Sequence, residues 1–174
     1  YVRSPAHHAD WPLLWIVLHI DDFLIIAPAD WADAFVKAYR KVFDVDDLGL
    51  VQRWMGIETT WAPEGVYLTH MRQIDLIVHR ARLTDNRNVQ VPMAEERLTK
   101  ALCCQTPAEV EFMKDKKYRN LVGAINYIAT QGIRYDVAYA ASELSRYNDC
   151  AGPGHWEALV HLVHYLRKRK YDGI

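Results

Sequence analysis

The sequence has few cysteines, no excess of positive charge and no apolar run long enough to span a bilayer. Its three cysteines, Cys103, Cys104 and Cys150, lack metal-ligand spacing. They argue against a disulfide framework and for a reducing, intracellular compartment, and we interpret Cys103 and Cys104 as a partly buried or idle thiol pair. With a formal net charge of -1, any contact with nucleic acid must come from local patches. We expect no membrane partner.

The chain begins at Tyr1 without an initiating methionine and ends at Ile174 directly after a basic helix. We therefore expect a segment of a longer polypeptide. Its 174 residues, 51% of them hydrophobic, suffice for a real core in one domain or two small lobes.

Two adjacent aspartates, Asp21 and Asp22, separate two apolar runs of strand length. This pattern predicts a tight β-hairpin with two carboxylates at its tip. Adjacent anions repel unless a cation lies between them, and a divalent metal with hard oxygen ligands suits such a pair. A receiver-type fold is set aside because Phe23 resumes a strand at once instead of leading into a loop and a helix. A solvated turn, in which the aspartates merely end two strands, stays open.

Further strands and two helices are expected in the first half. Residues 1–3, followed by a turn at 4–10, should pair with the strand that starts near Leu13. Asp30 is a candidate N-cap for the helix that follows the hairpin. Residues 53–61 and 65–68 predict a second hairpin with its loop at 62–64. Thr69 is a candidate N-cap for a helix with its inner face at Ile74, Ile77, Val78 and Ala81.

The last third reads as helical after an irregular segment at 84–105. Thr106-Pro107-Ala108-Glu109 is a capping box with proline at the first helical position, which is a fairly specific start signal. Three apolar stripes at helical spacing follow: Leu121, Val122, Ile125 and Ile128; Val137, Ala140, Ala141 and Leu144; Trp156, Leu159, Val160, Val163 and Leu166.

The order of these segments resembles the reverse transcriptase of Ty1/copia-type retrotransposons. The matching blocks are His19-Ile20-Asp21-Asp22 for Tyr-Val-Asp-Asp, the segment from Phe43 to Gly49, Trp54-Met55-Gly56-Ile57-Glu58, Gly65 to His70, Val91-Pro92-Met93, Tyr118 to Tyr127, Ala140 to Tyr147, and His155-Trp156. Together they cover nearly the whole chain. Two blocks depart from the family pattern: His19 replaces its tyrosine, and Ile133-Arg134-Tyr135-Asp136 stands where it has Thr-Arg-Pro-Asp.

The resemblance implies an α+β fold. Residues 1–68 would form the C-terminal part of a polymerase palm, with antiparallel hairpins and a helix, and residues 69–174 a helical thumb or connection region. The fingers, the first palm strand with its catalytic aspartate, and the RNase H domain would lie outside this chain. The expected activity of the complete enzyme is RNA-directed DNA polymerisation, in a cytoplasmic particle or the nucleus.

The resemblance also implies the roles of individual residues. Asp21 would be a catalytic ligand of Mg²⁺ or Mn²⁺, and Asp22 a catalytic ligand or close electrostatic support, with two ions in the complete enzyme. The nucleic-acid-binding residues would be His19, Trp54, Met55, Gly56, Arg72, Arg80, Arg82, Arg167 and Lys168. The partners would be an RNA or DNA template–primer and a dNTP, with the upstream and downstream polyprotein segments.

Other interpretations remain open from the residues alone. Trp54 and Met55 suit a core as well as a primer grip, and basic residues on an outer helix face are commonly just solvated. A zinc site at His7, His8 and Asp10, or at His161 and His164, would lack a fourth ligand at recognised spacing. A non-catalytic remnant or reused nucleic-acid-binding module is the main alternative function. An unrelated metal-dependent phosphohydrolase is a third.

Overall fold

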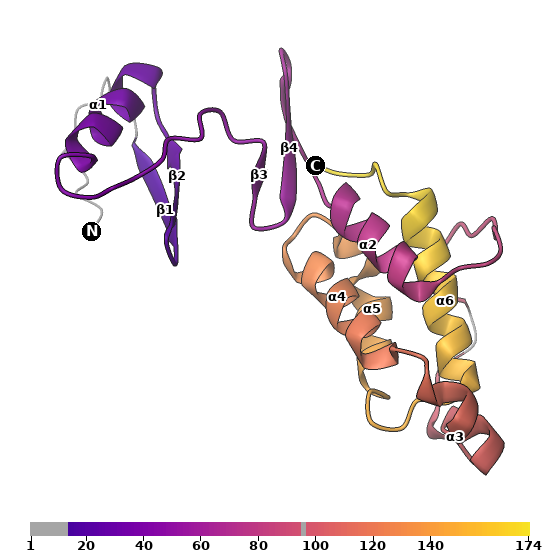
Figure 1. The fold of residues 1–174 in the computed structure, drawn as a ribbon. Coiled ribbons are helices and arrows are strands. Elements are labelled where there is room, and N and C mark those ends of the chain that lie inside the picture. The colour runs from indigo at the N-terminus through magenta and orange to yellow at the C-terminus, as the bar shows by residue number, and fades with distance from the viewer. Residues whose placement is uncertain (1–13, 95–96) are drawn as a thin grey trace. The chain divides into compact units, whose positions relative to one another are not determined.

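The computed structural model describes residues 14–94 and 97–174. Figure 1 shows small antiparallel sheets in the first part of the chain and helices in the rest, which confirms the predicted α+β class. The chain divides into two compact units, residues 1–54 and 55–174. The palm and thumb division after residue 68 stays a prediction. The strand expected at residues 1–3, the turn at 4–10, and His7, His8 and Asp10 lie outside the described residues.

The first unit contains a hairpin and one helix. Strand β1 (Trp15–His19) pairs with β2 (Asp22–Ile26), and helix α1 (Ala29–Tyr39) follows. An aromatic cluster joins them: the Phe23 and Tyr39 rings meet edge to face at 5.1 Å, and Tyr39 stacks on Phe43 at 4.6 Å. Even so, no described residue of this unit is buried.

The predicted cap of α1 is wrong. The helix begins at Ala29 after Pro28, so Asp30 lies within the first turn and makes no capping hydrogen bond. An aspartate there still favours the helix, because its charge opposes the positive end of the helix dipole.

The second predicted hairpin forms with a different beginning. Strands β4 (Ile57–Ala62) and β5 (Gly65–Thr69) pair with Ala62 opposite Gly65. A turn at Met55 and Gly56 separates β4 from the short strand β3 (Arg53–Trp54), so the continuous strand predicted over 53–61 is wrong. The φ angles of Met55 (+48°) and Gly56 (+77°) explain the break, since a strand needs negative φ at both positions.

Helix α2 (Met71–Ala81) confirms the predicted inner face, because Ile74, Ile77 and Ala81 are buried. Its predicted cap is wrong: His70 is the N-cap, and Thr69 ends β5 instead. The segment 84–105 is irregular as expected, apart from the 3-10 turn η1 (Lys100–Leu102).

The remaining helices complete the second unit. They are α3 (Pro107–Lys114), α4 (Tyr118–Thr130), the 3-10 turn η2 (Tyr135–Val137), α5 (Ala138–Ser145) and α6 (Pro153–Lys168). The capping box of α3 is confirmed in full, with Thr106 and Glu109 bonding to each other's backbone N–H. No helix within the described residues is long and apolar enough to cross a membrane.

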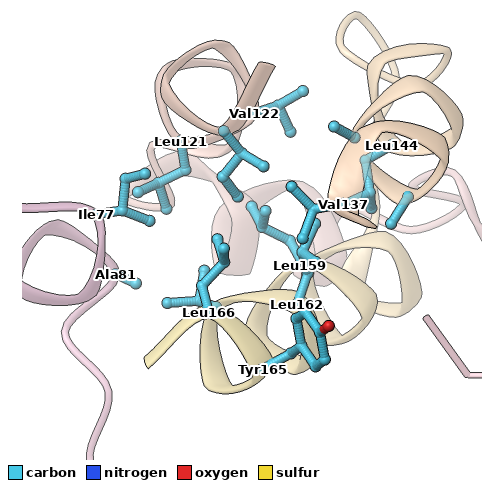
Figure 2. Close-up of a cluster of buried hydrophobic side chains, with 14 of the residues drawn as sticks. Ile77, Ala81, Leu121, Val122, Val137, Leu144, Leu159, Leu162, Tyr165 and Leu166 are labelled. Atoms are coloured by element: carbon cyan, nitrogen blue, oxygen red, sulfur yellow. The ribbon is translucent and has the colours of Figure 1, made fainter. Parts of the chain in front are cut away.

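The core of the second unit lies between α2, α4, α5 and α6. The three predicted stripes supply most of it, and Figure 2 shows Leu121 and Val122 of α4 facing Leu159, Leu162 and Leu166 of α6. The chain end also belongs to this unit, because Leu68 of β5 and Ile174 exchange backbone hydrogen bonds of 2.8 and 3.2 Å.

Candidate active-site hairpin and nucleic-acid surface

The acidic pair lies at the tip of the β1–β2 hairpin. His19 pairs with Asp22, which leaves Ile20 and Asp21 as the two turn residues. Ile20 has a φ of +56°, a conformation that β-branched residues rarely adopt, and its side chain is 80% exposed. Asp21 and Asp22 are exposed as well. A strained, exposed turn thus presents two adjacent carboxylates to solvent on a hydrogen-bonded scaffold.

Asp21 and Asp22 could supply two ligands of a metal site. Within residues 14–94 and 97–174, no group of three or more His, Cys, Asp or Glu residues is arranged to hold a metal ion. Two hard oxygen ligands fit a divalent cation of the Mg²⁺ type, which completes its shell with water and phosphate oxygens. Asp21 and Asp22 therefore suit a shared site in which other ligands come from beyond them.

His19 and Trp54 are brought together within the first unit. Their ring centroids lie 6.5 Å apart at an interplanar angle of 72°, an edge-to-face arrangement. His19 is exposed and Trp54 is half-buried, so both rings remain accessible from solvent. One aromatic contact thus links the residue beside the acidic turn to the last residue before the Met55–Gly56 turn.

The Met55–Gly56 turn is fixed by two side chains from the helical part of its own unit. The Tyr127 hydroxyl donates to the Met55 carbonyl at 2.6 Å, and His70 Nδ1 lies 3.2 Å from the Gly56 carbonyl. Positive φ at both turn residues is typical of a type I′ turn, where glycine is favoured. With both carbonyls bound on one side, the turn is held rigidly in place.

His70 is fully buried, and burial lowers the pKa of its imidazole despite the hydrogen bond to Gly56. A carbonyl can only accept, so Nδ1 carries the proton in this contact. The other nitrogen, Nε2, is buried without a partner among the described residues, as are both carboxylate oxygens of Glu58. Burial therefore favours the neutral imidazole of His70, and its Nε2 atom is enclosed.

Sequence reasoning missed His70 and Tyr127 as residues that position this turn. Tyr127 carries a weak signal, since it lies off the apolar stripe of α4, and a tyrosine at the edge of a core commonly bonds through its hydroxyl. His70 has no such signal in the sequence beyond its place in the Gly65–His70 block, because its partner, the Gly56 carbonyl, is 14 residues away on a different element.

The five basic residues predicted to track phosphates fall into two groups. Arg167 bonds to the Asn86 side chain and the Asp85 carbonyl, and Lys168 bonds to Asn88. By contrast, Arg72, Arg80 and Arg82 are exposed on or next to α2, and no ion pair or hydrogen bond of their side chains occurs within the described chain. The α2 arginines are thus the ones with free guanidinium groups.

The histidines of the zinc alternative have other partners. His161 Nε2 lies 3.0 Å from the Val91 carbonyl, and His164 Nε2 lies 3.0 Å from an Asp85 carboxylate oxygen. Both contacts attach the 84–105 segment to α6.

A buried ion pair occupies the block that departs from the family pattern. Arg134 is 1% exposed and grips Asp136 through two hydrogen bonds of 2.7 and 2.9 Å, while its third nitrogen donates to the Arg169 carbonyl. Although burial opposes ionisation, these bonds hold the pKa of Asp136 below its usual value. Through the bond from Arg134 to the Arg169 carbonyl, the 133–136 block thus holds the C-terminal end of α6 in place.

Comparison with known proteins identifies relatives of this chain. It is 30% identical over 156 residues to the Retrovirus-related Pol polyprotein from transposon TNT 1-94 of Nicotiana tabacum, covering 87% of this chain and 12% of that protein. It is 27% identical over 164 residues to the Pol polyprotein from transposon RE2 of Arabidopsis thaliana, covering 93% and 11%. The homologues of this chain are Ty1/copia-type retrotransposon Pol polyproteins.

The Pol homology extends over most of the chain, but the chain spans only about a tenth of the length of these polyproteins. A further relative is an uncharacterised mitochondrial protein of Arabidopsis thaliana, 20% identical over 162 residues, which are 92% of this chain and 64% of that protein. No protein-family model and no solved structure matches the chain.

Proposed function

We propose that this chain is part of a retrotransposon reverse transcriptase, comprising the later palm strands and the helical region that follows them. The observation that carries the proposal is the Asp21-Asp22 pair at the tip of an antiparallel hairpin, in a chain whose homologues are Pol polyproteins. The order of the motif blocks that follow this hairpin agrees with the assignment.

Asp21 and Asp22 would hold Mg²⁺ or Mn²⁺ with at least one further carboxylate from upstream in the polyprotein. When bound, two such ions stabilise the attacking and leaving oxygens of a phosphoryl transfer. The protein's own contribution is the hairpin, which holds the two carboxylates next to each other although their charges repel. His19 lies beside them, and its ring would lie next to the primer end.

The Met55–Gly56 turn would grip the primer backbone. Gly56 lets a phosphate approach the main chain closely, and the bonds from Tyr127 and His70 remove the turn's freedom before the primer arrives. Arg72, Arg80 and Arg82 would supply sequence-independent attraction to phosphates, which depends steeply on salt. Arg167 and Lys168 would add to it only by exchanging their present partners.

Metal binding tests the acidic pair on the chain as it is. Mn²⁺ titrated into ¹⁵N-labelled protein should broaden the amide signals of residues 19–23 through its unpaired electrons. Asp21→Asn should abolish this broadening, whereas Asp33→Asn, an exposed aspartate of α1, should leave it intact. Equal broadening in wild-type and Asp21→Asn protein would remove the acidic pair from the metal site.

Primer extension tests the activity. With only two carboxylates the chain alone should not extend a primer, whereas the chain joined to the polyprotein segment that precedes it should do so with Mg²⁺ and a dNTP. Asp21→Asn in the joined protein should abolish extension, and Asp33→Asn should not. Extension by the isolated chain that is lost in Asp21→Asn would show that the site is already complete.

A second candidate is a non-catalytic module that keeps the fold and binds nucleic acid. It is favoured by the uncharacterised mitochondrial relative, most of whose length matches this chain, and by the core that residues 55–174 build among themselves. Salt-dependent binding to a template–primer duplex, with no extension even in the joined protein, would support this alternative over the polymerase.

A further inference from the structure

Two cysteines that lie far apart in the sequence meet in the second unit. Cys103 follows the η1 turn and Cys150 lies in the connection between α5 and α6, yet their sulfur atoms are 2.7 Å apart. Both are free thiols. A disulfide bond is about 2.05 Å long, so a small rotation of the two side chains brings the sulfurs to bonding distance.

Contacts other than the Cys103–Cys150 pair also hold these two segments together. Gly152 lies so close to the chain at Leu102 that a Cβ on Gly152 would collide with the Leu102 carbonyl oxygen. The Tyr147 hydroxyl donates to the Leu98 carbonyl at 2.8 Å, and the Cys104 thiol donates to the Ala151 carbonyl at 3.3 Å. The Cys103–Cys150 approach is therefore a consequence of the fold.

The thiols are also accessible. Cys150 is exposed, and all three cysteines line an open cavity of about 610 Å³ whose rim includes Lys116, Lys117 and Arg119. A small polar oxidant can therefore reach the sulfur atoms, where the thiolate is the nucleophile in thiol oxidation.

We propose that Cys103 and Cys150 form a redox modification site, which hydrogen peroxide or a related hydroperoxide closes to a disulfide. The Cys150 thiolate attacks one peroxide oxygen, the O–O bond breaks, and the departing hydroxide takes a proton to form water. Cys150 is then a sulfenic acid, oxidised by two electrons. The Cys103 sulfur attacks the Cys150 sulfur, the S–O bond breaks, and the hydroxide leaves with the Cys103 proton as a second water. One peroxide is thus reduced for each disulfide formed.

The order of the two steps follows from the environment of each sulfur. Partial burial raises the pKa of Cys103 to about 11, and its hydrogen bond with Cys150 adds to the effect. Cys103 is therefore a poor first nucleophile, and it enters in the second step because its sulfur lies 2.7 Å from that of Cys150. Cys104 is the residue next to Cys103, but its thiol points to the Ala151 carbonyl, so it is the natural control.

The bond would tie the 84–105 segment to the α5–α6 connection, closing a loop between positions 47 residues apart. Such a cross-link stabilises a fold mainly by restricting the unfolded chain. For a protein of this size, a rise of roughly 5–10 °C in the unfolding midpoint is expected on oxidation.

The experiment treats the full chain with hydrogen peroxide, blocks remaining thiols and digests it with trypsin without reductant. The peptide 101–114, which contains Cys103 and Cys104, should be joined to the peptide 147–167, which contains Cys150. Reductant should separate them. Cys104→Ser should keep both the cross-link and the rise in midpoint, and Cys103→Ser should lose both.

Cys150→Ser should lose the cross-link and leave Cys103 unoxidised at the same peroxide dose. Melting of each untreated variant shows that it folds before its oxidation is compared. Cross-linking that survives in Cys103→Ser but not in Cys104→Ser would assign the bond to Cys104 instead. Oxidation of all three thiols to sulfinic acids, with no joined peptides, would overturn the proposal.

Discussion

At the scale of single residues, backbone conformation distinguishes two glycines that look alike in the sequence. Gly56 has a φ of +77° and its missing Cβ would meet the Gln73 amide nitrogen at 3.1 Å and Tyr127 at 3.5 Å. Gly123 lies within helix α4 with nothing near its missing Cβ. The same substitution should therefore have opposite effects at the two sites.

Gly56→Ala should lower the free energy of unfolding by about 1–2 kcal/mol, because alanine is strained at positive φ. Gly123→Ala should raise it by about 0.5–1 kcal/mol, since alanine is the better helix former. Urea denaturation of both variants beside the wild type measures the difference. Equal effects of the two substitutions would show that the Met55–Gly56 turn does not have the conformation described.

His70 makes a residue-level prediction about pH. Burial lowers the pKa of His70, so the unfolded chain binds a proton more readily than the folded one. This contribution to stability is complete above the ordinary histidine pKa of about 6.5 and is lost as the pH falls below it. His155, whose pKa burial also lowers, has an effect of the same sign.

His70→Gln keeps an amide donor for the Gly56 carbonyl but cannot take up a proton. Between pH 7.5 and 5.5 the wild type should lose more stability than this variant, by at most about 1.4 kcal/mol per pH unit. Urea midpoints at both pH values test it, with His79→Gln on the exposed face of α2 as the control. A variant that follows the wild type at both values would mean that His70 does not titrate in this range.

At the scale of elements, the capping box of α3 makes a cleanly matched test. Thr106 accepts a hydrogen bond from the Glu109 N–H at the start of α3, whereas Thr99 occupies the N-cap position of η1 and makes no side-chain cap bond. Thr106→Ala should lower the free energy of unfolding by about 1 kcal/mol, and Thr99→Ala should change it by less than about 0.5 kcal/mol. Denaturation curves compare the two, and a cost at Thr99 equal to that at Thr106 would contradict the assignment.

Elements with a strong period could be predicted from the sequence. The apolar stripes of α4, α5 and α6 predict most of the buried core, because each helix turns one face inward. The two apolar runs on either side of the acidic turn predict the ends of β1 and β2 to within two residues. Caps were less predictable. Asp30 and Thr69 are good capping residues by type, but Pro28 and the end of β5 set where α1 and α2 begin.

For contacts between distant elements, the sequence did not indicate which residue is the partner. The hydroxyl of Tyr127 reaches a carbonyl 72 residues away, and Arg167 bonds to Asn86, 81 residues away. The basic cluster at the end of α6, which the sequence suggests for phosphate binding, is thus partly used to hold the 84–105 segment. The acidic pair was predictable because both of its carboxylates belong to one tight turn, whereas a metal site built from several elements would not have been.

At the scale of the whole molecule, the core and the acidic pair belong to different units. Among residues 14–94 and 97–174, the buried ones lie within 55–174, and the hairpin unit exposes large side chains such as Trp15 (59%) and Leu18 (61%). Exposed apolar strands are prone to pair with other chains. We therefore expect the isolated chain to self-associate through this hairpin.

Removal of the hairpin unit should therefore separate stability from self-association. A shortened chain of residues 50–174 keeps β3 and the whole core, so its unfolding midpoint should stay within about 3 °C of the full chain, a change of under about 1 kcal/mol. Its sedimentation should show a monomer at concentrations where the full chain associates. Leu18→Lys in the full chain, which places a charge on the exposed strand, should reduce association without changing the midpoint.

If the shortened chain unfolds many degrees earlier than the full chain, the helical core depends on residues 1–49. If the shortened chain associates as strongly as the full chain, the contact surface lies on the helical unit.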